Sequence, residues 1–283
     1  MKLEGKVALV TASGRGIGRT TALTLAREGA DVILNSFNPE STAAVAAEVE
    51  ASGRKALPLP GNILEAEVVA QVVEKGIEAF GRIDILVNNM GGRPPEKRTS
   101  EGALGEVVAW WDDFYEGTLK APVLMSETVA PHLMKQKSGK IVNLGSIAGR
   151  FTPPVAMMES IVMPAYCAMK TAINSYTQTL ARRLGPYNVN VNCVCPGIVY
   201  TDAWKRHSTS AVENIPEFKG MRVEDWFQGI FVDDYPSRFP QTPMRREQTV
   251  DDIAQAIIYL VSEDSKNVTG QILNVDGGMV MNR

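Results

Sequence analysis

Short apolar runs alternate with longer amphipathic stretches along almost the whole chain. The runs have the length of strands, whereas the stretches between them repeat apolar residues with a helical period. The pattern predicts strands at Lys6–Thr11, Asp31–Asn35, Lys55–Leu59, Ile83–Val87, Lys140–Leu144, Val189–Val194 and Gln271–Val275. It predicts helices after the first strand to about Glu28, then at Pro39–Ser52, Glu65–Phe80, roughly Val107–Lys137, Pro164–Leu184 and Thr249–Ser262. Pro122 and Pro131 should bend or interrupt the fourth of these helices.

Strands that alternate with helices favour an α/β fold with one parallel sheet covered on both faces. A glycine-rich first turn predicts the doubly wound Rossmann arrangement, with about seven strands. Because no linker or repeat divides the chain, residues 1–283 are expected to form a single domain.

The long mixed segment Tyr200–Gln248 follows the carboxyl end of a predicted strand and is rich in aromatic residues. A segment at that place is where a substrate cover would sit, so we predict a lid at about residues 200–248. The alternative is a surface insertion that packs on the domain or on a neighbouring subunit. Its aromatic residues include Trp204, Trp226, Phe227, Phe231 and Tyr235.

Composition narrows the classes of partner. The net charge of −3 gives no electrostatic footprint for nucleic acid or an anionic membrane, and no apolar run is long enough to span a bilayer. The N-terminus runs directly into a strand without a signal-peptide core. Two histidines and three cysteines suggest neither a metal site nor a disulfide framework. Cys193 and Cys195 share one strand face and read best as buried thiols. We expect a cytoplasmic protein that holds no metal.

Two motifs carry candidate chemistry. The turn Gly14–Gly18 follows a strand and opens a helix, which is the setting in which backbone N–H groups can hold a pyrophosphate. Alone, such a turn can also be a tight turn without a ligand. Tyr166 and Lys170 are one helical turn apart, so both side chains share one face. An ammonium group beside a phenol stabilises the phenolate, and such a pair can exchange a proton with a carbonyl oxygen.

The chain resembles the classical short-chain dehydrogenase/reductase family over nearly its whole length. The matching pieces, in the family's order, are Thr11-Ala-Ser-Gly-Arg-Gly-Ile-Gly18, Asn88-Asn-Met-Gly91, Asn143-Leu-Gly-Ser146, Tyr166-Cys-Ala-Met-Lys170, Pro196-Gly197 with Thr201, and Asp276-Gly-Gly278. The resemblance implies an NAD(P)(H)-dependent oxidoreductase that interconverts a carbonyl compound and an alcohol. It also implies a homotetramer, or a homodimer.

The same resemblance assigns roles to residues. Ser146 would orient the substrate oxygen, Tyr166 would be the acid/base, and Lys170 would hold the nicotinamide ribose. The implied cofactor-binding residues are Ser13, Gly14, Arg15, Gly16, Ile17, Gly18, Ser36, Asn62, Ile63, Asn88, Met90, Gly91, Tyr166, Lys170, Pro196, Gly197, Val199 and Thr201.

Three departures from the family pattern stand out. Thr118 occupies the place of an Asn that supports a proton-relaying water, so we expect a rewired or slower relay with reduced turnover. Ser146 and Tyr166 are farther apart than is usual, because residues are added within Phe151–Met163. Pro153, Pro154, Met157, Met158 and Met163 in this insertion predict an apolar wall beside the substrate, the alternative being an exposed loop. Asn62 replaces an Asp that contacts adenine, and Met90 replaces a small residue.

Charge favours NADP(H), with NAD(H) as the alternative. The second strand leads into Asn35-Ser-Phe-Asn38 without the acid that usually binds the ribose 2′-hydroxyl of NAD. Arg15 could instead reach a 2′-phosphate. The aromatic and methionine content predicts an apolar or mid-sized small-molecule substrate. The alternative function is a cofactor-binding protein with little catalysis, acting as a redox sensor or assembly subunit.

Overall fold

A single seven-stranded sheet organises the molecule, and all of its neighbouring strands are parallel. The computed structural model describes residues 1–91, 104–153, 164–232, 234–235, 239 and 241–281. The strands are β1 (Val7–Val10), β2 (Asp31–Leu34), β3 (Ala56–Pro58), β4 (Ile85–Asn88), β5 (Gly139–Leu144), β6 (Val189–Pro196) and β7 (Ile272–Val275). Their order, β3-β2-β1-β4-β5-β6-β7, confirms the prediction of a doubly wound sheet.

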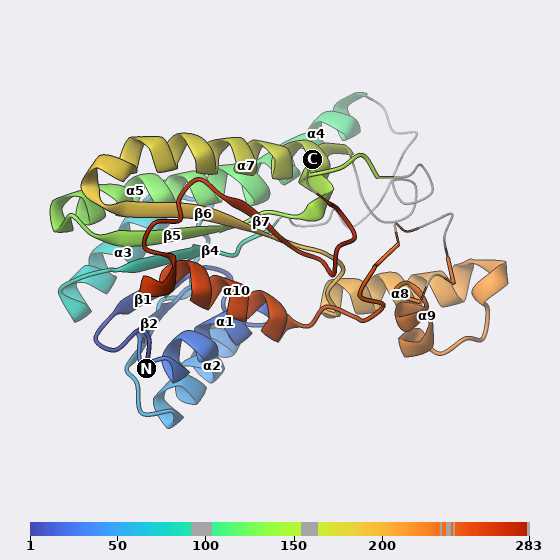
Figure 1. Ribbon diagram of the computed structural model, residues 1–283, viewed down its shortest axis with the longest axis horizontal. Helices are drawn as coiled ribbons and strands as arrows, with labels where there is room; N and C mark the ends of the chain where they lie inside the picture. Colours follow the sequence, from blue (N-terminus) through green and yellow to red (C-terminus); the bar gives the residue numbers. More distant parts are fainter. Residues whose placement is uncertain (92–103, 154–163, 233, 236–238, 240, 282–283) are drawn as a thin grey trace.

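Helices cover both faces of the sheet, as expected for parallel strands. Figure 1 shows α1, α2 and α10 on one side and α3, α5 and α7 on the other. These helices are α1 (Gly16–Arg27), α2 (Pro39–Ala51), α3 (Ala66–Phe80), α5 (Ala121–Gln136), α7 (Pro164–Leu184) and α10 (Val250–Val261). Alternation along each strand divides the core: Ala8 and Val10 of β1 pack towards α1 and α10, whereas Val7 and Leu9 pack towards α3 and α5.

The long helix predicted near the middle of the chain contains an irregular turn but is not interrupted. Helix α4 (Leu104–Tyr115) passes through a π turn, η1 (Glu116–Lys120), into α5. Pro122 has no N–H to donate to the preceding turn, and the N–H of Ala121 donates to the carbonyl oxygen of Glu116, five residues back, so the widened turn just before Pro122 accommodates the ring. Pro131 lies inside α5, which continues to Gln136. The irregularity therefore falls at Thr118, the residue that departs from the family pattern.

The predicted lid contains helices α8 (Asp202–Asn214) and α9 (Val223–Gly229), with the short turn η4 (Pro216–Phe218) between them. In Figure 1 these helices lie beyond the edge of the sheet at which the strands end. Aromatic rings form a separate cluster here, which we call the lid core, and Trp226 stacks on Tyr235 within it at 5.9 Å. The lid core consists of Phe218, Trp226, Phe227, Phe231 and Tyr235, all buried. Most of the aromatic residues of this segment thus stabilise the lid itself.

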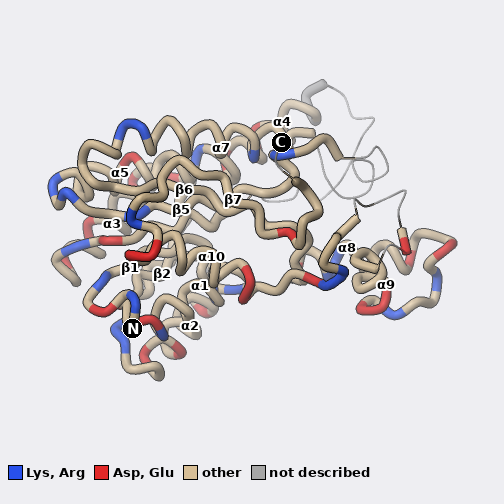
Figure 2. Tube along the Cα trace, viewed as in Figure 1, with Lys and Arg blue, Asp and Glu red and all other residues tan. Residues whose placement is uncertain are grey.

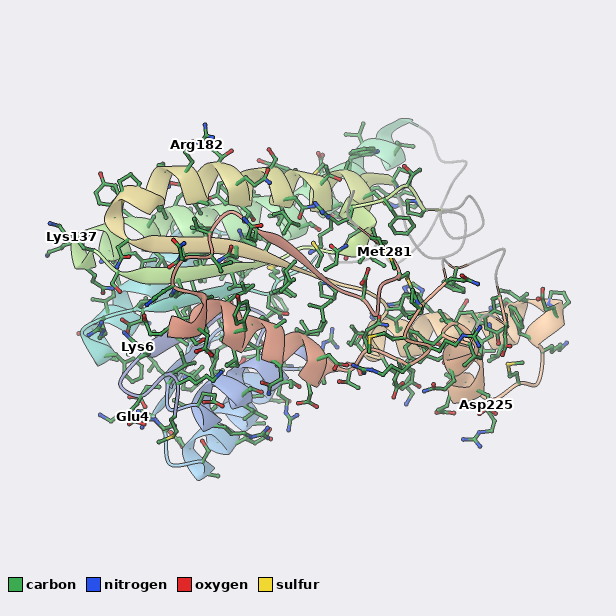
Figure 3. All side chains as sticks on the ribbon, in the orientation of Figure 1. Glu4, Lys6, Lys137, Arg182, Asp225 and Met281 are labelled. Carbon is green, nitrogen blue, oxygen red and sulfur yellow. The ribbon has the colours of Figure 1, made fainter. Side chains whose placement is uncertain are left out.

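Charge is distributed without a dominant sign. Figure 2 shows acidic and basic residues interspersed along the trace. The charged side chains of Lys137, Arg182 and Asp225 point away from the body of the molecule (Figure 3). Among the described residues, no helix has both the length and the apolar character needed to cross a bilayer.

Candidate active site

The predicted motifs converge at the carboxyl edge of the sheet. Strands β1 and β4 are neighbours there, and the chain leaves them towards opposite sides of the sheet order. Such a reversal opens a place for a ligand beyond the strand ends. The glycine turn follows β1, Asn88-Asn89 ends β4, Ser146 follows β5, and Pro196-Gly197 ends β6. The fold therefore brings together segments that are far apart in the sequence.

The shape and packing of the turn after β1 depend on its glycines. Gly16 has φ 54°, a conformation that favours glycine. A Cβ on Gly18 would lie 2.3 Å from the carbonyl oxygen of Ala12 and 2.4 Å from Nδ2 of Asn89. In this fully described turn, neither a side-chain cap nor an acidic residue neutralises the start of α1. Its free N–H groups and partial positive charge suit a pyrophosphate.

Asn89 fastens the turn after β1 to the end of β4. Its Nδ2 donates to the carbonyl oxygens of Thr11 and Ala12 at 3.2 and 3.1 Å. The hydroxyl of Thr11 in turn accepts from the backbone N–H groups of Asn89 and Met90 at 3.0 and 3.2 Å. Sequence reasoning did not assign this residue a role, although it lies within the quoted motif. The signal was its place immediately after a buried strand.

Ser146 is held against α7 by the turn that follows it, η2 (Ile147–Gly149). Gly149 lies directly on the backbone of α7, where a Cβ would meet the carbonyl carbon of Lys170 at 2.6 Å. The carbonyl oxygen of Gly149 accepts hydrogen bonds from Asn174 Nδ2 at 3.1 Å and Thr171 Oγ1 at 3.3 Å. This contact fixes the Ser146 segment relative to the helix that carries Tyr166 and Lys170. Neither Gly149 nor Asn174 was singled out from the sequence.

Tyr166 and Lys170 lie one turn apart on α7, as predicted. The edge of the Phe114 ring packs against Tyr166, with centroids 6.0 Å apart. Lys170 is buried, and its Nζ donates to the carbonyl oxygen of Leu144 at 2.6 Å, at the end of β5. The same Nζ lies 5.7 Å from the centre of the Tyr166 ring. The ammonium group is therefore desolvated and close to the phenol.

Thr118 is fully buried in the π turn. Its hydroxyl finds no hydrogen-bonding partner in the part of the chain that the structure describes. A buried hydroxyl normally has a partner, and an ordered water is the usual one where protein groups are missing. The position thus suits a residue that binds water close to α7.

Of the other residues predicted to bind the cofactor, some are buried and some form hydrogen bonds within the protein. Ser13 is buried, and its hydroxyl donates to the carbonyl oxygen of Asn35 at 3.1 Å. The Ile63 side chain is buried among the core residues beneath the sheet, so only its backbone could face a ligand. The Asn62 amide donates to Glu65 at 2.9 Å. Asn88 donates to Ser126 and Asn143, both at 2.8 Å, and so ties α5 to the sheet.

Several of the other predicted residues lie at the same edge. Met90 packs against the α3 and α5 side of the core, and Gly91 is exposed. Pro196 and Val199 are buried where β6 turns into the lid, and Gly197 sits between them. The predicted insertion lies partly outside the described residues: Pro153 is described, whereas Pro154, Met157, Met158 and Met163 are not.

The base of the lid touches the glycine turn. The Cγ2 of Thr201, the residue before α8, would lie 3.9 Å from a Cβ on Gly16. Arg15 forms an exposed ion pair with Asp202 at 3.4 Å. The side chain that was expected to reach a 2′-phosphate is therefore directed at the lid in this structure, and a ligand phosphate would compete with Asp202 for it.

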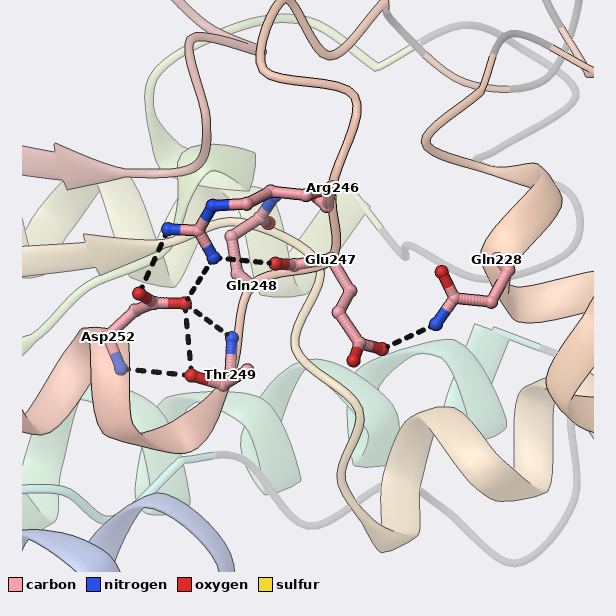
Figure 4. Close-up of polar contacts among 6 residues, drawn as sticks. All are labelled: Gln228, Arg246, Glu247, Gln248, Thr249 and Asp252. Atoms are coloured by element: carbon pink, nitrogen blue, oxygen red, sulfur yellow. Dashed lines mark hydrogen bonds and ion pairs between the residues drawn. The ribbon is translucent and has the colours of Figure 1, made fainter.

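A second polar network fastens the lid's return to α10 (Figure 4). Arg246 donates from two nitrogens to the carboxylate of Asp252, each at 3.0 Å. Asp252 also completes a capping box with Thr249 at the start of α10. Glu247 accepts from Gln228 of α9 at 2.8 Å. The network thus joins the lid helix α9 to the N-terminus of α10.

This network predicts a pH-dependent contribution to stability. The hydrogen bond from Arg246 is the main cause that lowers the pKa of Asp252 to about 2, against an ordinary value of 3.8. Because the carboxylate is the stabilised form, its contribution is complete above the ordinary value and disappears as the pH falls towards 2. Asp252→Asn should lower the free energy of unfolding at neutral pH by about 1 kcal/mol. Urea denaturation at a series of pH values measures this difference.

Asp251→Asn is the matched control, because Asp251 is exposed in the same first turn of α10 and is not part of the capping box. Its effect should be smaller and reflect only the helix dipole. A difference between wild type and Asp252→Asn that persisted unchanged to pH 2 would contradict the assignment.

The chain is similar to known proteins over its whole length. A family model described as short chain dehydrogenase matches residues 6–211, and one described as enoyl-(acyl carrier protein) reductase matches residues 234–280. A 3-oxoacyl-[acyl-carrier-protein] reductase of Thermotoga maritima is 31% identical over 282 residues, which cover 99% of this chain and 100% of that protein. A 7alpha-hydroxysteroid dehydrogenase of Clostridium sardiniense is 36% identical over 282 residues, covering 99% of this chain and 95% of that one.

One solved structure is similar to this fold over almost the whole chain. It is a 7 alpha-hydroxysteroid dehydrogenase complexed with NADH and 7-oxo glycochenodeoxycholic acid, with a TM-score of 0.80 and 29% identity. The match covers 99% of this chain and 96% of that one.

Proposed function

The chain belongs to the short-chain dehydrogenase family, and from this premise we propose that it is an NADP(H)-dependent reductase or dehydrogenase acting on an apolar or mid-sized ketone, aldehyde or alcohol. The observation that carries the proposal is the packing of η2 on α7, which joins the Ser146 segment to Tyr166 and Lys170. A protein that only binds a cofactor could use the Lys170 ammonium for the ribose, but it has no need for a phenol and a serine hydroxyl on the same side of the ligand. The catalytic reading is therefore preferred to a sensor or assembly role.

The glycine turn fits a dinucleotide. A pyrophosphate needs a backbone that it can approach closely and N–H groups without partners, and Gly14–Gly18 with the start of α1 provide both. Bound there, a nicotinamide cofactor supplies or accepts the hydride. The protein's own residues orient the substrate and transfer the proton.

Each of the four proposed catalytic residues has a distinct task. The Ser146 hydroxyl holds the substrate oxygen, and the Tyr166 hydroxyl gives that oxygen a proton in reduction or removes one in oxidation. The buried ammonium of Lys170, 5.7 Å from the centre of the Tyr166 ring, would hold the cofactor's ribose by hydrogen bonds. Thr118, with its unpartnered buried hydroxyl, holds a water that returns protons to this pair.

The apolar surroundings of Tyr166 support the substrate class. Tyr166 packs at the margin of an apolar cluster that includes Phe151, Cys167 and Trp204 together with the lid core. The relative from Clostridium sardiniense is named for a steroid substrate, which fits such surroundings. A panel of ketones that differ in size and charge tests this proposal. Faster reduction of bulky apolar ketones than of small or anionic ones supports it, and the reverse order contradicts it.

The environment of Ser36 supports NADP(H). Ser36 is buried after the end of β2, and its hydroxyl accepts from Thr42 Oγ1 at 3.0 Å. A Cβ on Gly14 would lie 2.7 Å from this hydroxyl and 2.4 Å from that of Ser41. Hydroxyl groups, rather than a carboxylate, therefore line the place beside the glycine turn. They can donate to a 2′-phosphate without repelling it.

A fluorescence titration with NADPH and NADH tests the preference. Wild type should bind NADPH more tightly. Ser36→Asp should weaken NADPH binding by at least about tenfold, because a carboxylate near a phosphate costs up to about 4 kcal/mol before screening. The same variant should bind NADH equally well or better. Ser41→Ala controls for loss of a hydroxyl without added charge. Tighter binding of NADH by wild type would overturn the preference and leave the reaction class in place.

A further inference from the structure

Phe37 carries the most exposed large apolar side chain among the residues that the structure describes. It is 79% exposed, more than Met1 and Met281 near the two ends of the chain, which are 77% and 71% exposed. A single exposed apolar residue is ordinary on a protein surface, so exposure alone assigns no role. The place of this ring in the fold decides whether it has one.

The backbone on both sides of Phe37 is fixed by hydrogen bonds. Before it, the carbonyl oxygen of Ser36 accepts from the backbone N–H of Gly61 at 3.0 Å. After it, Asn38 caps helix α2, where its Oδ1 accepts from the backbone N–H of Ser41 at 2.8 Å. The chain therefore presents the ring from a fixed backbone, which reduces the entropy that is lost when a ligand binds to it.

The loop that carries Phe37 lies between two turns that are predicted to bind the cofactor. On one side, the backbone N–H of Ser13, just before Gly14, donates to the carbonyl oxygen of Asn35 at 2.9 Å. On the other side, Gly61, which binds Ser36, directly precedes Asn62 after β3. The loop thus stands beyond the end of β2, with the turns after β1 and β3 on either side of it.

The direction of a bound dinucleotide follows from the sheet order. Its pyrophosphate is assigned to the start of α1, and its nicotinamide must reach Tyr166, whose helix α7 packs against β6. Strands β5 and β6 lie on one side of β1, whereas β2 and β3 lie on the other. The adenosine half therefore extends over the ends of β2 and β3. Phe37 is an exposed aromatic residue at that end of the ligand.

We propose that Phe37 forms one wall of the adenine site and stacks on the base. This inference rests on the proposed function, because it requires a dinucleotide at the glycine turn. Adenine has a flat, uncharged π face that suits a phenyl ring, and loss of one base–aromatic stack weakens binding by about five- to 100-fold. Stacking removes apolar surface of both partners from water. It thus gives a use to a ring that the protein itself leaves in solvent.

The stack contributes to affinity without distinguishing the two nicotinamide cofactors. NADPH and NADH carry the same adenine, and a phenyl ring has no charge that attracts or repels a 2′-phosphate. Phe37 therefore has a different task from its neighbour Ser36, which is proposed to select between the two. Removal of the ring should raise the Kd of both cofactors by a similar factor. It should leave kcat nearly unchanged, because hydride and proton are exchanged at the other end of the cofactor.

The test compares full-length wild type, Phe37→Ala and Phe37→Trp. The probes are NADPH, NADH and ADP-ribose, which carries the adenosine and the pyrophosphate without nicotinamide. Phe37→Ala should bind all three about five- to 100-fold more weakly. Phe37→Trp should keep the affinity of wild type, and ADP-ribose should quench the fluorescence of the added indole, measured as the difference from wild type. Tyr187→Ala is the matched control, because Tyr187 is exposed and precedes β6, at the opposite edge of the sheet.

The outcomes separate this inference from the proposed function. Unchanged affinity of Phe37→Ala for all three probes would overturn the stack alone, and so would Phe37→Trp that binds ADP-ribose without quenching. Tighter binding of NADH than of NADPH by wild type would contradict only the cofactor preference, and Phe37→Ala should then still weaken NADH binding. A wild type that binds none of the probes would overturn both proposals.

Phe37→Ala should fold normally, because the ring is exposed, and its melting temperature should match that of wild type. A change in its oligomeric state without loss of affinity would assign the ring to a contact between copies of the chain and overturn the stack.

Discussion

Replacing Tyr166 with Phe is expected to lower kcat by about 10² to 10⁴-fold, the range for loss of a positioned acid/base group. The phenyl ring keeps the edge contact with Phe114, so the helix and its packing should be unchanged. NADPH affinity should change little, because the variant retains the glycine turn and Lys170. The measurement is steady-state turnover on the best ketone found, with NADPH binding by fluorescence in parallel.

Tyr176→Phe is the matched control for this experiment. Tyr176 lies on the same helix α7 and also loses only a hydroxyl, but that hydroxyl donates to Glu127 at 3.0 Å on the outer side. Its turnover should stay close to that of wild type. Full turnover in Tyr166→Phe would remove the proposed proton transfer, and an equal loss in both variants would point to a general effect on α7.

The local sequence pattern was sufficient to predict those parts of the fold and site whose geometry is set by residues close together in the sequence. The strand β1 is recognisable because all four of its residues are apolar and buried. Tyr166 and Lys170 could be paired because a helix turns once in the four residues that separate them. The glycine turn could be assigned because it stands between a strand and a helix. In each case the relevant geometry is set within one element or one turn.

Contacts between segments that are far apart in the sequence could not be predicted from local pattern. Asn89 donates a hydrogen bond to the turn after β1, and Asn174 contacts both Cys193 of β6 and Gly149 in the turn after Ser146. Their partners are defined only once the sheet order is fixed. The aromatic residues of the lid have no regular period, so the sequence could not show that Trp226 and its neighbours pack on one another.

Gly149→Ala is expected to lower both stability and turnover, although glycine at this position looks unremarkable in the sequence. The added Cβ would lie 2.6 Å from the carbonyl carbon of Lys170 and 2.8 Å from the backbone nitrogen of Thr171. Backbone atoms within a helix cannot move aside as a flexible side chain can. The turn η2 must therefore lift from α7, and the Ser146 segment moves with it.

Overpacking of this kind costs about 1 to 3 kcal/mol of unfolding free energy, which urea denaturation measures. A shift of the Ser146 hydroxyl relative to Tyr166 should also lower kcat by at least about tenfold, since small misplacements near reacting groups are costly. Gly185→Ala is the matched control, because a Cβ there meets nothing within 4 Å. Wild-type turnover in a destabilised Gly149→Ala would mean that η2 supports the fold without positioning Ser146. A fall in turnover with NADPH binding retained would identify this backbone contact as the element that aligns the two halves of the site.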